Sequence, residues 1–397
     1  MTDHRQFGDL LAYPLRSGVT VAAANRGSGI KMLNMGELFR YPWIPATEMA
    51  RVKIAAYDPE RVLLQPGDLM FARRSLTLEG AGKCSIVKEI EEPTTWESSI
   101  IRARLDREVA HPLYYFYYFR SQIGRRSVET IVEQVAAAGI RLSELRSLRV
   151  PVPGLREQLA VAEVLGALDD KIAANTKLAG SVDEYLAAVI LRHLKAGLQE
   201  VVPLSHIADI NAESVKPSLE NSLRYIDIAS VSVGRFDFPA VSAWTEAPSR
   251  ARRRVCKGDT LWSTVRPNRR SHALNLSDDP LLVGSTGLAV VSPRETGFAY
   301  LYQVTKLPHF TTYLEGAAEG SAYPAVRADR FGTAPVPLLP KADRDAFELV
   351  AAPLREHSAS LDDENRTLAE VRDALLPQLM SGKIQVKDAG KMVEEVL

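Results

Sequence analysis

One motif occurs twice in this chain, and the repeat constrains the fold more than any other feature. A Pro-Val-Pro sequence at 151–153 recurs at 335–337, and a long run poor in Gly and Pro follows each copy. The far ends of the runs match at almost the same offset: Leu191, Leu194 and Gly197 correspond to Leu376, Leu379 and Gly382. A unit of this length indicates a duplicated domain rather than a solenoid, and a duplicated binding domain favours a target in two parts.

Composition limits the class of protein. The chain has 397 residues, of which 46% are hydrophobic and 25% charged, which is typical of a soluble protein with at least two domains. Its two cysteines, Cys84 and Cys256, are too few for a disulfide framework and indicate a reducing, cytoplasmic setting. The longest apolar stretch, 113–119, is far shorter than the roughly 20 residues of a membrane span. We therefore expect no membrane role.

The net charge of zero hides a small asymmetry. Residues 1–150 hold 21 Lys and Arg against 17 Asp and Glu, whereas residues 338–397 hold 8 against 12. Mildly basic globules that alternate with acidic helical runs are compatible with a nucleic-acid ligand. Differences of this size are equally compatible with ordinary variation along a chain.

The two runs are predicted to be long amphipathic helices. In each, apolar residues recur at four-three spacing, which is typical of a heptad seam. Polar residues on these seams are Asn175 in the first and His357 and Glu364 in the second. Since both helices lie in one chain and match in length, the simplest burial pairs them with each other. The expected packing residues are Leu165, Leu168, Ile172, Val182, Leu186, Leu354, Leu361, Leu368 and Leu375.

The length of the helical pair suggests a spacer. The uninterrupted stretch from Leu168 to Leu194 would be roughly 40 Å long at about 1.5 Å per residue. That length is close to the one-turn repeat of about 34–36 Å that separates paired half-sites on DNA. A helical hairpin that simply joins two domains is an equally good interpretation of length alone.

Both globules are predicted to mix helices and strands in the same order. A Gly-Asp turn precedes an apolar strand at 65–72 in the first globule and at 257–263 in the second. Strand-like segments at 99–103 and 287–291 follow, and then aromatic segments at 112–119 and 298–302. We interpret the aromatic segments as packed core helices, with base stacking as the alternative.

At these residues the chain resembles the DNA-specificity (S) subunits of type I restriction–modification systems. The first run opens with a Pro-rich edge, Glu157-Gln158 and an apolar stretch to Leu168-Asp169, similar to the first central helix of that family. The second run ends on 367–382, which is similar to the C-terminal ending of the family. Pro66-Gly67-Asp68 with Gly82-Lys83 resembles the core of its recognition domains.

The resemblance covers about residues 63 to 386, and the chain departs from it in places. The second globule has no match to Gly82-Lys83 and is richer in Arg over 263–275. Pro353 is expected to interrupt the start of the second helix, because proline cannot donate a backbone hydrogen bond.

The resemblance implies an α+β fold with an internal pseudo-two-fold relation. Two similar target recognition domains, at 1–153 and 201–339, would be joined by two long antiparallel helices, at 154–200 and 340–386, that form a coiled-coil spacer, with a tail at 387–397. Each domain would read one half of a bipartite DNA target, and the helices would dock two modification (methyltransferase) subunits. The resemblance leaves open whether two restriction subunits join them. This chain would be non-catalytic, with S-adenosylmethionine, ATP and Mg bound only by partner subunits.

Double-stranded DNA would be contacted by cationic and amide side chains on exposed loops, since phosphates need cations and base edges favour Arg, Lys, Asn and Gln. Each candidate could equally belong to a solvated surface. The candidates are Arg51, Lys53, Arg73, Arg74, Lys83, Arg252, Arg253, Arg254, Arg266, Asn268, Arg269 and Arg270, with Tyr323 and Arg327 as weaker ones.

The sequence offers no catalytic site of its own. The stretch 79–84 is similar to a phosphate loop, but Thr77 stands in place of its first Gly and Cys84 in place of its Ser or Thr. Asp68 and Asp259 are interpreted as turn-capping carboxylates rather than nuclease residues. None of the seven His has metal-ligand spacing to another His or Cys. The main competing hypothesis is a protein scaffold whose repeated helices bind partner helices without reading DNA.

Overall fold

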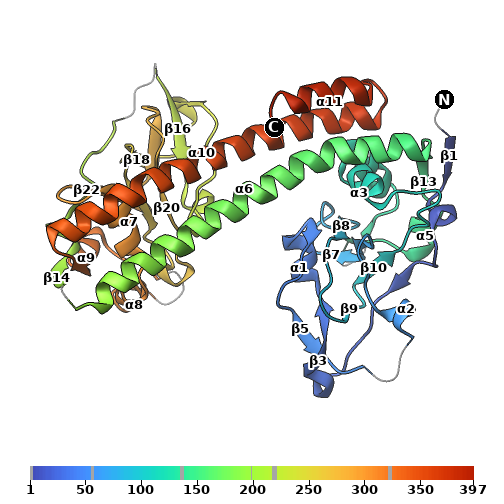
Figure 1. Ribbon diagram of the computed structural model, residues 1–397, viewed down its shortest axis with the longest axis horizontal. Coiled ribbons are helices and arrows are strands. Elements are labelled where there is room, and N and C mark those ends of the chain that lie inside the picture. Colours follow the sequence, from blue (N-terminus) through green and yellow to red (C-terminus); the bar gives the residue numbers. More distant parts are fainter. Residues whose placement is uncertain (1–2, 55–57, 135–137, 198, 217–220, 321–323) are drawn as a thin grey trace. The chain divides into compact units, whose positions relative to one another are not determined.

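A computed structural model describes residues 3–54, 58–134, 138–197, 199–216, 221–320 and 324–397. The chain forms two compact units (Figure 1). The first unit consists of residues 1–173 and 365–397, and the second of residues 174–364. Within the described ranges, no helix is both long and apolar enough to cross a membrane.

Two long helices, α6 (Leu155–Lys195, 41 residues) and α10 (Lys341–Met380, 40 residues), each contribute to both units. Helix α6 begins at Leu155, one residue after the start predicted for the first helix. Gly166 is accommodated inside it, where a Cβ atom would lie 3.4 Å from Leu113. The small residue thus lets α6 lie close to the first globule.

The expected interruption at Pro353 is wrong. Helix α10 begins well before it, at Lys341, and continues through the proline. Proline costs an interior helix one hydrogen bond, because it has no N–H to offer the carbonyl four residues before it. That carbonyl belongs to Leu349, whose residue is 79% exposed, so water can reach the freed acceptor.

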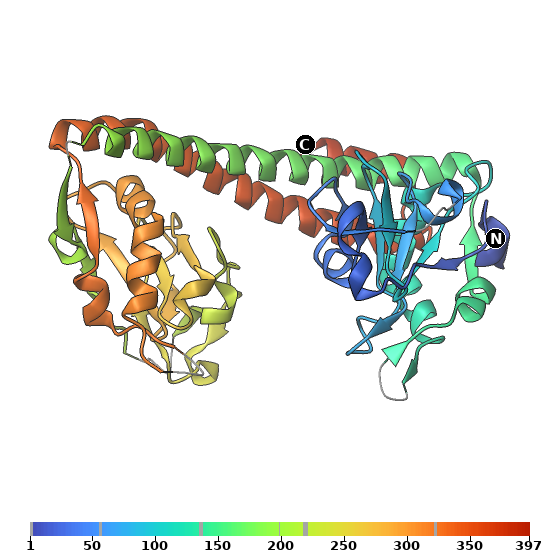
Figure 2. The same cartoon turned by 90° about the horizontal axis from the view of Figure 1, so that it is seen from below.

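The long helices pack against each other within each unit, as the ribbons in both views show (Figures 1 and 2). In the first unit the N-terminal part of α6 and the C-terminal part of α10 share one apolar cluster. In the second unit the C-terminal part of α6 and the N-terminal part of α10 share another. The pairing is therefore antiparallel. Seven predicted packing residues are buried, namely Leu165, Leu168, Val182, Leu186, Leu361, Leu368 and Leu375, and Ile172 and Leu354 are partly buried against the same clusters.

Short strands build the globule of the first unit. Its main sheet has the order β2-β10-β6-β8-β4, with β2 at Arg16–Ser17, β10 at Ile100–Ala103, β6 at Leu69–Ala72, β8 at Cys84–Val87 and β4 at Trp43–Ile44. A second sheet has the order β5-β3-β9, with β5 at Ala50–Val52, β3 at Arg26–Leu33 and β9 at Thr94–Trp96. Smaller pairings are β11-β12-β7 (Glu133–Gln134, Ala138–Gly139, Arg74–Ser75) and β1-β13 (Asp3–Gln6, Arg149–Val152).

The globule of the second unit has two four-stranded sheets. One has the order β15-β22-β19-β20, at Ala208–Ile210, Leu288–Pro293, Thr260–Ser263 and His272–Leu274. The other has the order β17-β16-β21-β18, at Ser242–Ala243, Ser222–Ile226, Leu282–Ser285 and Ala251–Arg254. A pair of strands, β14 (Glu200–Pro203) and β23 (Pro335–Leu338), joins the globule to the helices.

The aromatic segments are core helices, as expected. In α3 (Pro112–Arg120) every residue from Tyr114 to Phe119 is at most 3% exposed, and α7 (Phe298–Thr305) buries Tyr300 and Tyr302 equally well. Base stacking is therefore not available to these rings. The remaining helices are α1 (Met35–Arg40), α2 (Pro59–Val62), α4 (Gln122–Glu129), α5 (Leu142–Ser147), α8 (Pro308–Gly316), α9 (Ala328–Gly332) and α11 (Val386–Glu394).

The predicted tail also contributes to the core of the first unit. Helix α11 occupies most of it, and Ala389 and Val393 on this helix are buried in the cluster that includes Leu379 and Met380 of α10. Apolar residues at 386, 389 and 393 give one apolar face to a single short helix.

From α3 and α7 onward the elements of the two units begin at one constant offset in residue number, which we call the repeat offset. Strand β13 begins at Arg149 and β23 at Pro335, and α6 begins at Leu155 and α10 at Lys341. The repeat offset is slightly larger than the distance between the Pro-Val-Pro sequences. The structural equivalent of Pro151 is thus Pro337. Both carbonyls accept from a tyrosine, Tyr115 and Tyr300 respectively, although these two tyrosines differ from the repeat offset by one residue. The two Pro-Val-Pro sequences therefore do not occupy equivalent positions in the fold.

Candidate nucleic-acid interface

The first unit presents a charged hairpin at the end of its main sheet. Strands β6 and β8 are antiparallel and fully buried, and they anchor the connection at 73–83. Arg74 is exposed on this connection, whereas Arg73 donates to the carbonyl of Ser98 at 3.4 Å. Lys83 closes the connection and donates to the carbonyl of Phe39 at 3.3 Å. Buried strands thus hold an exposed cationic loop in place.

The equivalent hairpin of the second unit connects β19 to β20. Its connection, 264–271, exposes Asn268, Arg269 and Arg270, and Pro267 is buried beneath them. Arg266 and Arg270 adopt φ values of 53° and 54°, in the left-handed region that non-glycine residues seldom occupy. Such strain persists only where the surroundings impose it, and it is concentrated at functional sites.

A neighbouring segment closes each hairpin at equivalent positions. In the first unit the backbone N–H of Ile140 donates to the carbonyl of Arg73 at 3.0 Å, and Ala138 pairs with Ser75. In the second unit Arg266 donates to the carbonyl of Pro324 at 2.7 Å, and the repeat offset makes Pro324 the equivalent of Ala138. The candidate Arg327 follows this segment, exposed and 3.6 Å from Asp329. Tyr323 lies outside the described residues.

His272 supports the strained hairpin from below. Its ring stacks on Trp262 at 4.7 Å between centroids, and its Nδ1 lies 2.6 Å from the carbonyl of Arg270. Burial lowers the pKa of His272 to about 4, so the ring is neutral at neutral pH. A neutral ring with Nδ1 protonated donates to that carbonyl and fixes the backbone of Arg270.

The candidates Arg51 and Lys53 lie on the second sheet of the first unit and just beyond it. Arg51 makes a bidentate ion pair with Glu92 at 2.8 and 3.0 Å, and the nearly buried Lys31 contacts the same carboxylate at 2.9 Å. Hydrogen bonds from Arg51 and then Lys31 lower the pKa of Glu92 to about 2. Lys53 is exposed. Of the two, Lys53 is thus the better placed for DNA, and the role of Arg51 stays a prediction.

The candidates Arg252, Arg253 and Arg254 lie on β18, an edge strand. Arg252 donates to its neighbouring carbonyl at 2.7 Å, and Arg254 lies 3.4 Å from Glu213. The Nε of Arg253 is buried without a hydrogen-bond partner among the described residues. Only Arg254 is exposed, so the structure separates this cluster from the hairpin candidates.

Sequence reasoning missed two arginines beside the first hairpin. Arg125 on α4 donates to the carbonyls of Leu78 and Ala81 at 3.1 and 2.8 Å. Burial, together with the nearby charges of Arg120 and Arg125, lowers the pKa of Lys83. Arg120 and Arg125 lie far from residues 73–83 in the sequence, so no sequence pattern indicates that they approach this hairpin.

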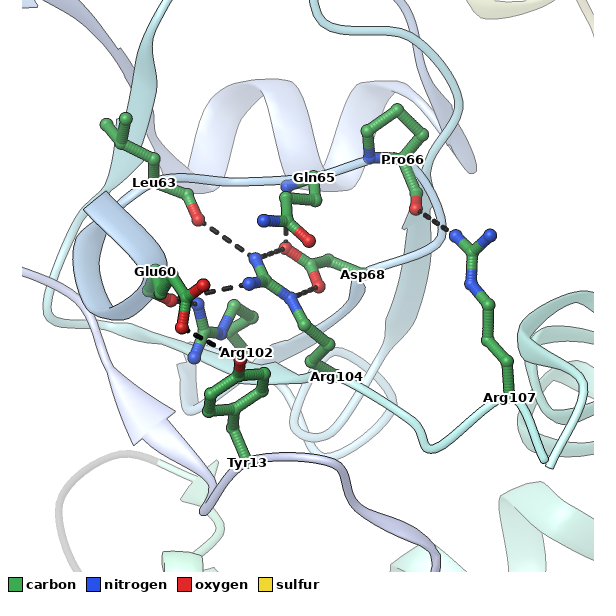
Figure 3. Close-up of polar contacts among 9 residues, drawn as sticks. All are labelled: Tyr13, Glu60, Leu63, Gln65, Pro66, Asp68, Arg102, Arg104 and Arg107. Atoms are coloured by element: carbon green, nitrogen blue, oxygen red, sulfur yellow. Dashed lines mark hydrogen bonds and ion pairs between the residues drawn. The ribbon is translucent and has the colours of Figure 1, made fainter. Parts of the chain in front are cut away.

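The Gly-Asp turns before β6 and β19 are capped as expected. Asp68 accepts from the backbone N–H of Gln65 at 2.8 Å, and Asp259 accepts from that of Cys256 at 2.7 Å. In the first unit Arg104 also binds Asp68 with two bonds of 2.7 Å (Figure 3). Burial raises the pKa of Asp259. These carboxylates hold turns, and no metal-binding group of His, Cys, Asp or Glu occurs among the described residues.

The long helices also expose apolar side chains. Leu159, Leu178 and Tyr185 on α6 are 39%, 45% and 53% exposed, and Leu349 and Val350 on α10 are 79% and 46% exposed. Singly exposed apolar side chains are normal on protein surfaces, whereas a contiguous patch of them marks a contact with another protein.

Comparison with known proteins gives this arrangement a context. No protein-family profile matches the chain. The Escherichia coli (strain K12) type I restriction enzyme EcoKI specificity subunit is 26% identical over 177 residues, 44% of this chain and 37% of that protein. The Methanocaldococcus jannaschii type I restriction enzyme MjaVIII specificity subunit is 26% identical over 117 residues, 30% of this chain and 28% of that protein. The chain thus matches about a third of the length of each curated relative.

A solved structure agrees over nearly the whole chain. The S subunit of a type I restriction–modification system from M. genitalium has a TM-score of 0.58, with 15% sequence identity and 95% of each chain covered. The chain resembles a type I specificity subunit in sequence and in fold.

Proposed function

We propose that this chain is the DNA-recognition subunit of a type I restriction–modification complex, which reads a bipartite target and scaffolds the methyltransferase subunits. The main supporting observation is the pair of equivalent hairpins. The connections 73–83 and 264–271 follow corresponding strands and expose Arg74 in one unit and Asn268, Arg269 and Arg270 in the other. These side-chain types bind phosphates and base edges.

In this proposal the chain itself is non-catalytic and works in the cytoplasm. Methylation with S-adenosylmethionine and cleavage with ATP and Mg belong to partner chains. Two methyltransferase subunits would dock on the helices, where Tyr185 and Leu349 expose apolar surface. The proposal leaves open whether two restriction subunits join this assembly.

The two hairpins differ in sequence and backbone conformation. In the first hairpin, β7 pairs with β12, so Arg74 lies opposite Gly139. In the second hairpin, the backbone turns at two arginines, Arg266 and Arg270, that have left-handed φ values. Two unlike loops would read two unlike half-sites, so the proposed target is asymmetric. The helices α6 and α10 would set the gap between the half-sites.

The experiment is a selection from a randomised duplex library with the full chain and its methylating partner subunits. Two defined blocks of bases separated by a constant unspecified gap are expected. The matched control carries Arg74→Gln and Arg269→Gln, and it should lose enrichment of both blocks while still binding the methylating subunits. Enrichment of no sequence by an intact complex would instead support the DNA-independent scaffold.

A further inference from the structure

Polar contacts join α6 to α10 at several places along the seam between them, and three of these contacts share a pattern. Arg372 binds Asp169 at 2.6 Å in the first unit. In the second unit Asn175 donates to Glu364 at 2.9 Å. The third contact, also in the second unit, joins Arg355 to Asp183 at 2.7 Å. In both ion pairs α6 supplies the acid and α10 the arginine.

One member of each ion pair is largely shielded from water, whereas the other members, Arg372 and Asp183, have side chains that are 25% and 42% exposed. The side chains of Asp169 and Arg355 are 10% and 8% exposed, and Asn175 is 5% exposed. Asp169 also accepts a hydrogen bond of 2.6 Å from Tyr117, and Arg355 lies over the ring of Tyr302. Salt screens the shielded members less than exposed groups, so like charges brought together here would repel.

The internal repeat makes a wrong pairing conceivable. Because α6 and α10 carry apolar stripes that are equivalent under the repeat offset, each could bury its stripe against its own counterpart in a second copy of the chain. The same offset makes Arg355 the equivalent of Asp169. An α10–α10 pair would therefore place Arg355 opposite Arg372, and an α6–α6 pair would place Asp183 opposite Asp169.

At the centre of the seam, an α10–α10 pair would also bring like charges close together. In an α10–α10 pair Glu364 would lie opposite Leu361, within one helical turn of Glu364 of the second copy. In an α6–α6 pair Asp183 would keep its contact with Lys306, which softens the repulsion there. In an α10–α10 pair Arg372 would likewise keep its contact with Asp373 at 2.8 Å, so each like pair retains one partial compensation.

We infer that these three contacts restrict each long helix to its partner in the same chain and exclude exchange of helices between two copies. The apolar stripes stabilise either pairing, and the charges choose between them. This inference stands apart from the proposed function. If that function also holds, helix selection keeps two different reading domains together and prevents symmetric particles.

The test compares charge variants of the full chain after refolding from denaturant, with two affinity tags mixed in equal amounts. The variant Asp169→Arg with Arg372→Asp keeps the native pair with its charges exchanged. It also makes both like pairs complementary, because Arg at 169 then faces Asp183 and Asp at 372 faces Arg355. The matched control exchanges the charges of the exposed residues Glu163 and Arg192 on α6.

The natural chain and the control should refold as monomers, as measured by light scattering. Purification through one affinity tag should not retain chains that carry the other tag. The exchanged-pair variant should increase the doubly tagged dimer by about tenfold or more. If that variant does not fold, the variant Glu364→Gln provides the test. It removes the two carboxylates that would face each other in an α10–α10 pair and keeps an amide oxygen that can accept from Asn175. This variant should also increase the dimer. Equal dimer fractions in the natural chain and in the folded variant would overturn the inference. DNA plays no part in this readout.

Discussion

Gln158 and Arg344 are equivalent residues of the repeat, and each joins the first turn of its long helix to equivalent carbonyl groups. Gln158 donates to Pro153 and Val109 at 2.9 and 3.1 Å. Arg344 donates to Leu339 and Glu295 at 3.0 and 3.1 Å, and the repeat offset relates each of these residues to its counterpart in the first unit.

The two residues differ in what they can accept. Gln158 also accepts from the N–H of His111 at 2.8 Å, just before α3. Arginine has no acceptor, and in the second unit the carboxylate of Glu348 accepts from the N–H groups of Ala299 and Tyr300 at the start of α7. One amide thus does in the first unit what two charged residues do in the second.

Replacing Gln158 with Leu should destabilise the first unit. The side chain is fully buried, so its loss leaves a donor and two acceptors without partners, at a cost of about 2–4 kcal/mol. Thermal unfolding followed by circular dichroism measures the change. The control Gln378→Leu removes an exposed amide from α10 and should leave the melting temperature almost unchanged. Equal melting of both variants would contradict the buried role of Gln158.

Removing Arg104 should cost more than removing the pair it forms. Arg104→Leu leaves the carboxylate of Asp68, 1% exposed, without its bidentate partner, and we expect a loss of about 3–5 kcal/mol. Adding Asp68→Asn to this variant removes the buried charge but keeps an oxygen that accepts from the backbone N–H of Gln65. Part of the lost free energy of unfolding should therefore be recovered. Urea unfolding monitored in the first unit gives both values. A double variant no more stable than the single one would refute this account.

The exposed hairpin cations should govern the salt dependence of DNA binding. Arg74→Gln or Arg269→Gln should each weaken binding and reduce the slope of log affinity against log salt by about 1, because one phosphate contact is lost. Fluorescence anisotropy with the selected duplex, from about 50 to 200 mM salt, provides the slopes. Arg156→Gln, at an exposed site on α6, is the control. A slope unchanged in either hairpin variant removes that arginine from the interface.

Acid should destabilise the second unit through His272. The folded protein keeps this ring neutral down to a pKa of about 4, whereas the unfolded chain protonates it near pH 6.5. Stability is therefore complete above pH 6.5 and falls as the pH is lowered towards 4, by about 2 kcal/mol at pH 5. His272→Phe retains the ring on Trp262 and should lose this dependence. The melting temperatures of the natural chain and of His272→Phe are measured at pH 7.5 and 5.0. If both proteins lose the same amount between these pH values, His272 is not responsible.

The sequence predicts periodic features well and distant contacts poorly. The seams of α6 and α10 and the buried aromatic helices follow from local spacing, which period and burial determine together. The passage of α10 through Pro353 depends on solvent access to one carbonyl, which no local pattern reveals.

The candidate interface divides in the same way. The hairpin cations were accessible to reasoning because loops that follow apolar strands are exposed. The ion pair of Arg51 with Glu92, and the approach of Arg125 to the first hairpin, join residues far apart in sequence. Charge counts cannot separate such structural arginines from ligand-binding ones. Asn175 and Glu364 were visible as polar exceptions on the seams, but their hydrogen bond emerged only from the fold.

Strands β14 and β23 run side by side where the second globule meets the helices, with Glu200 opposite Leu338 and Pro203 opposite Pro335. The chain therefore enters and leaves this globule at neighbouring points. A segment with adjacent ends can be exchanged as a cassette, since a graft must restore only two junctions on one ribbon. If the proposed function holds, recombination at such a boundary would let a lineage acquire a new second reading domain in one step.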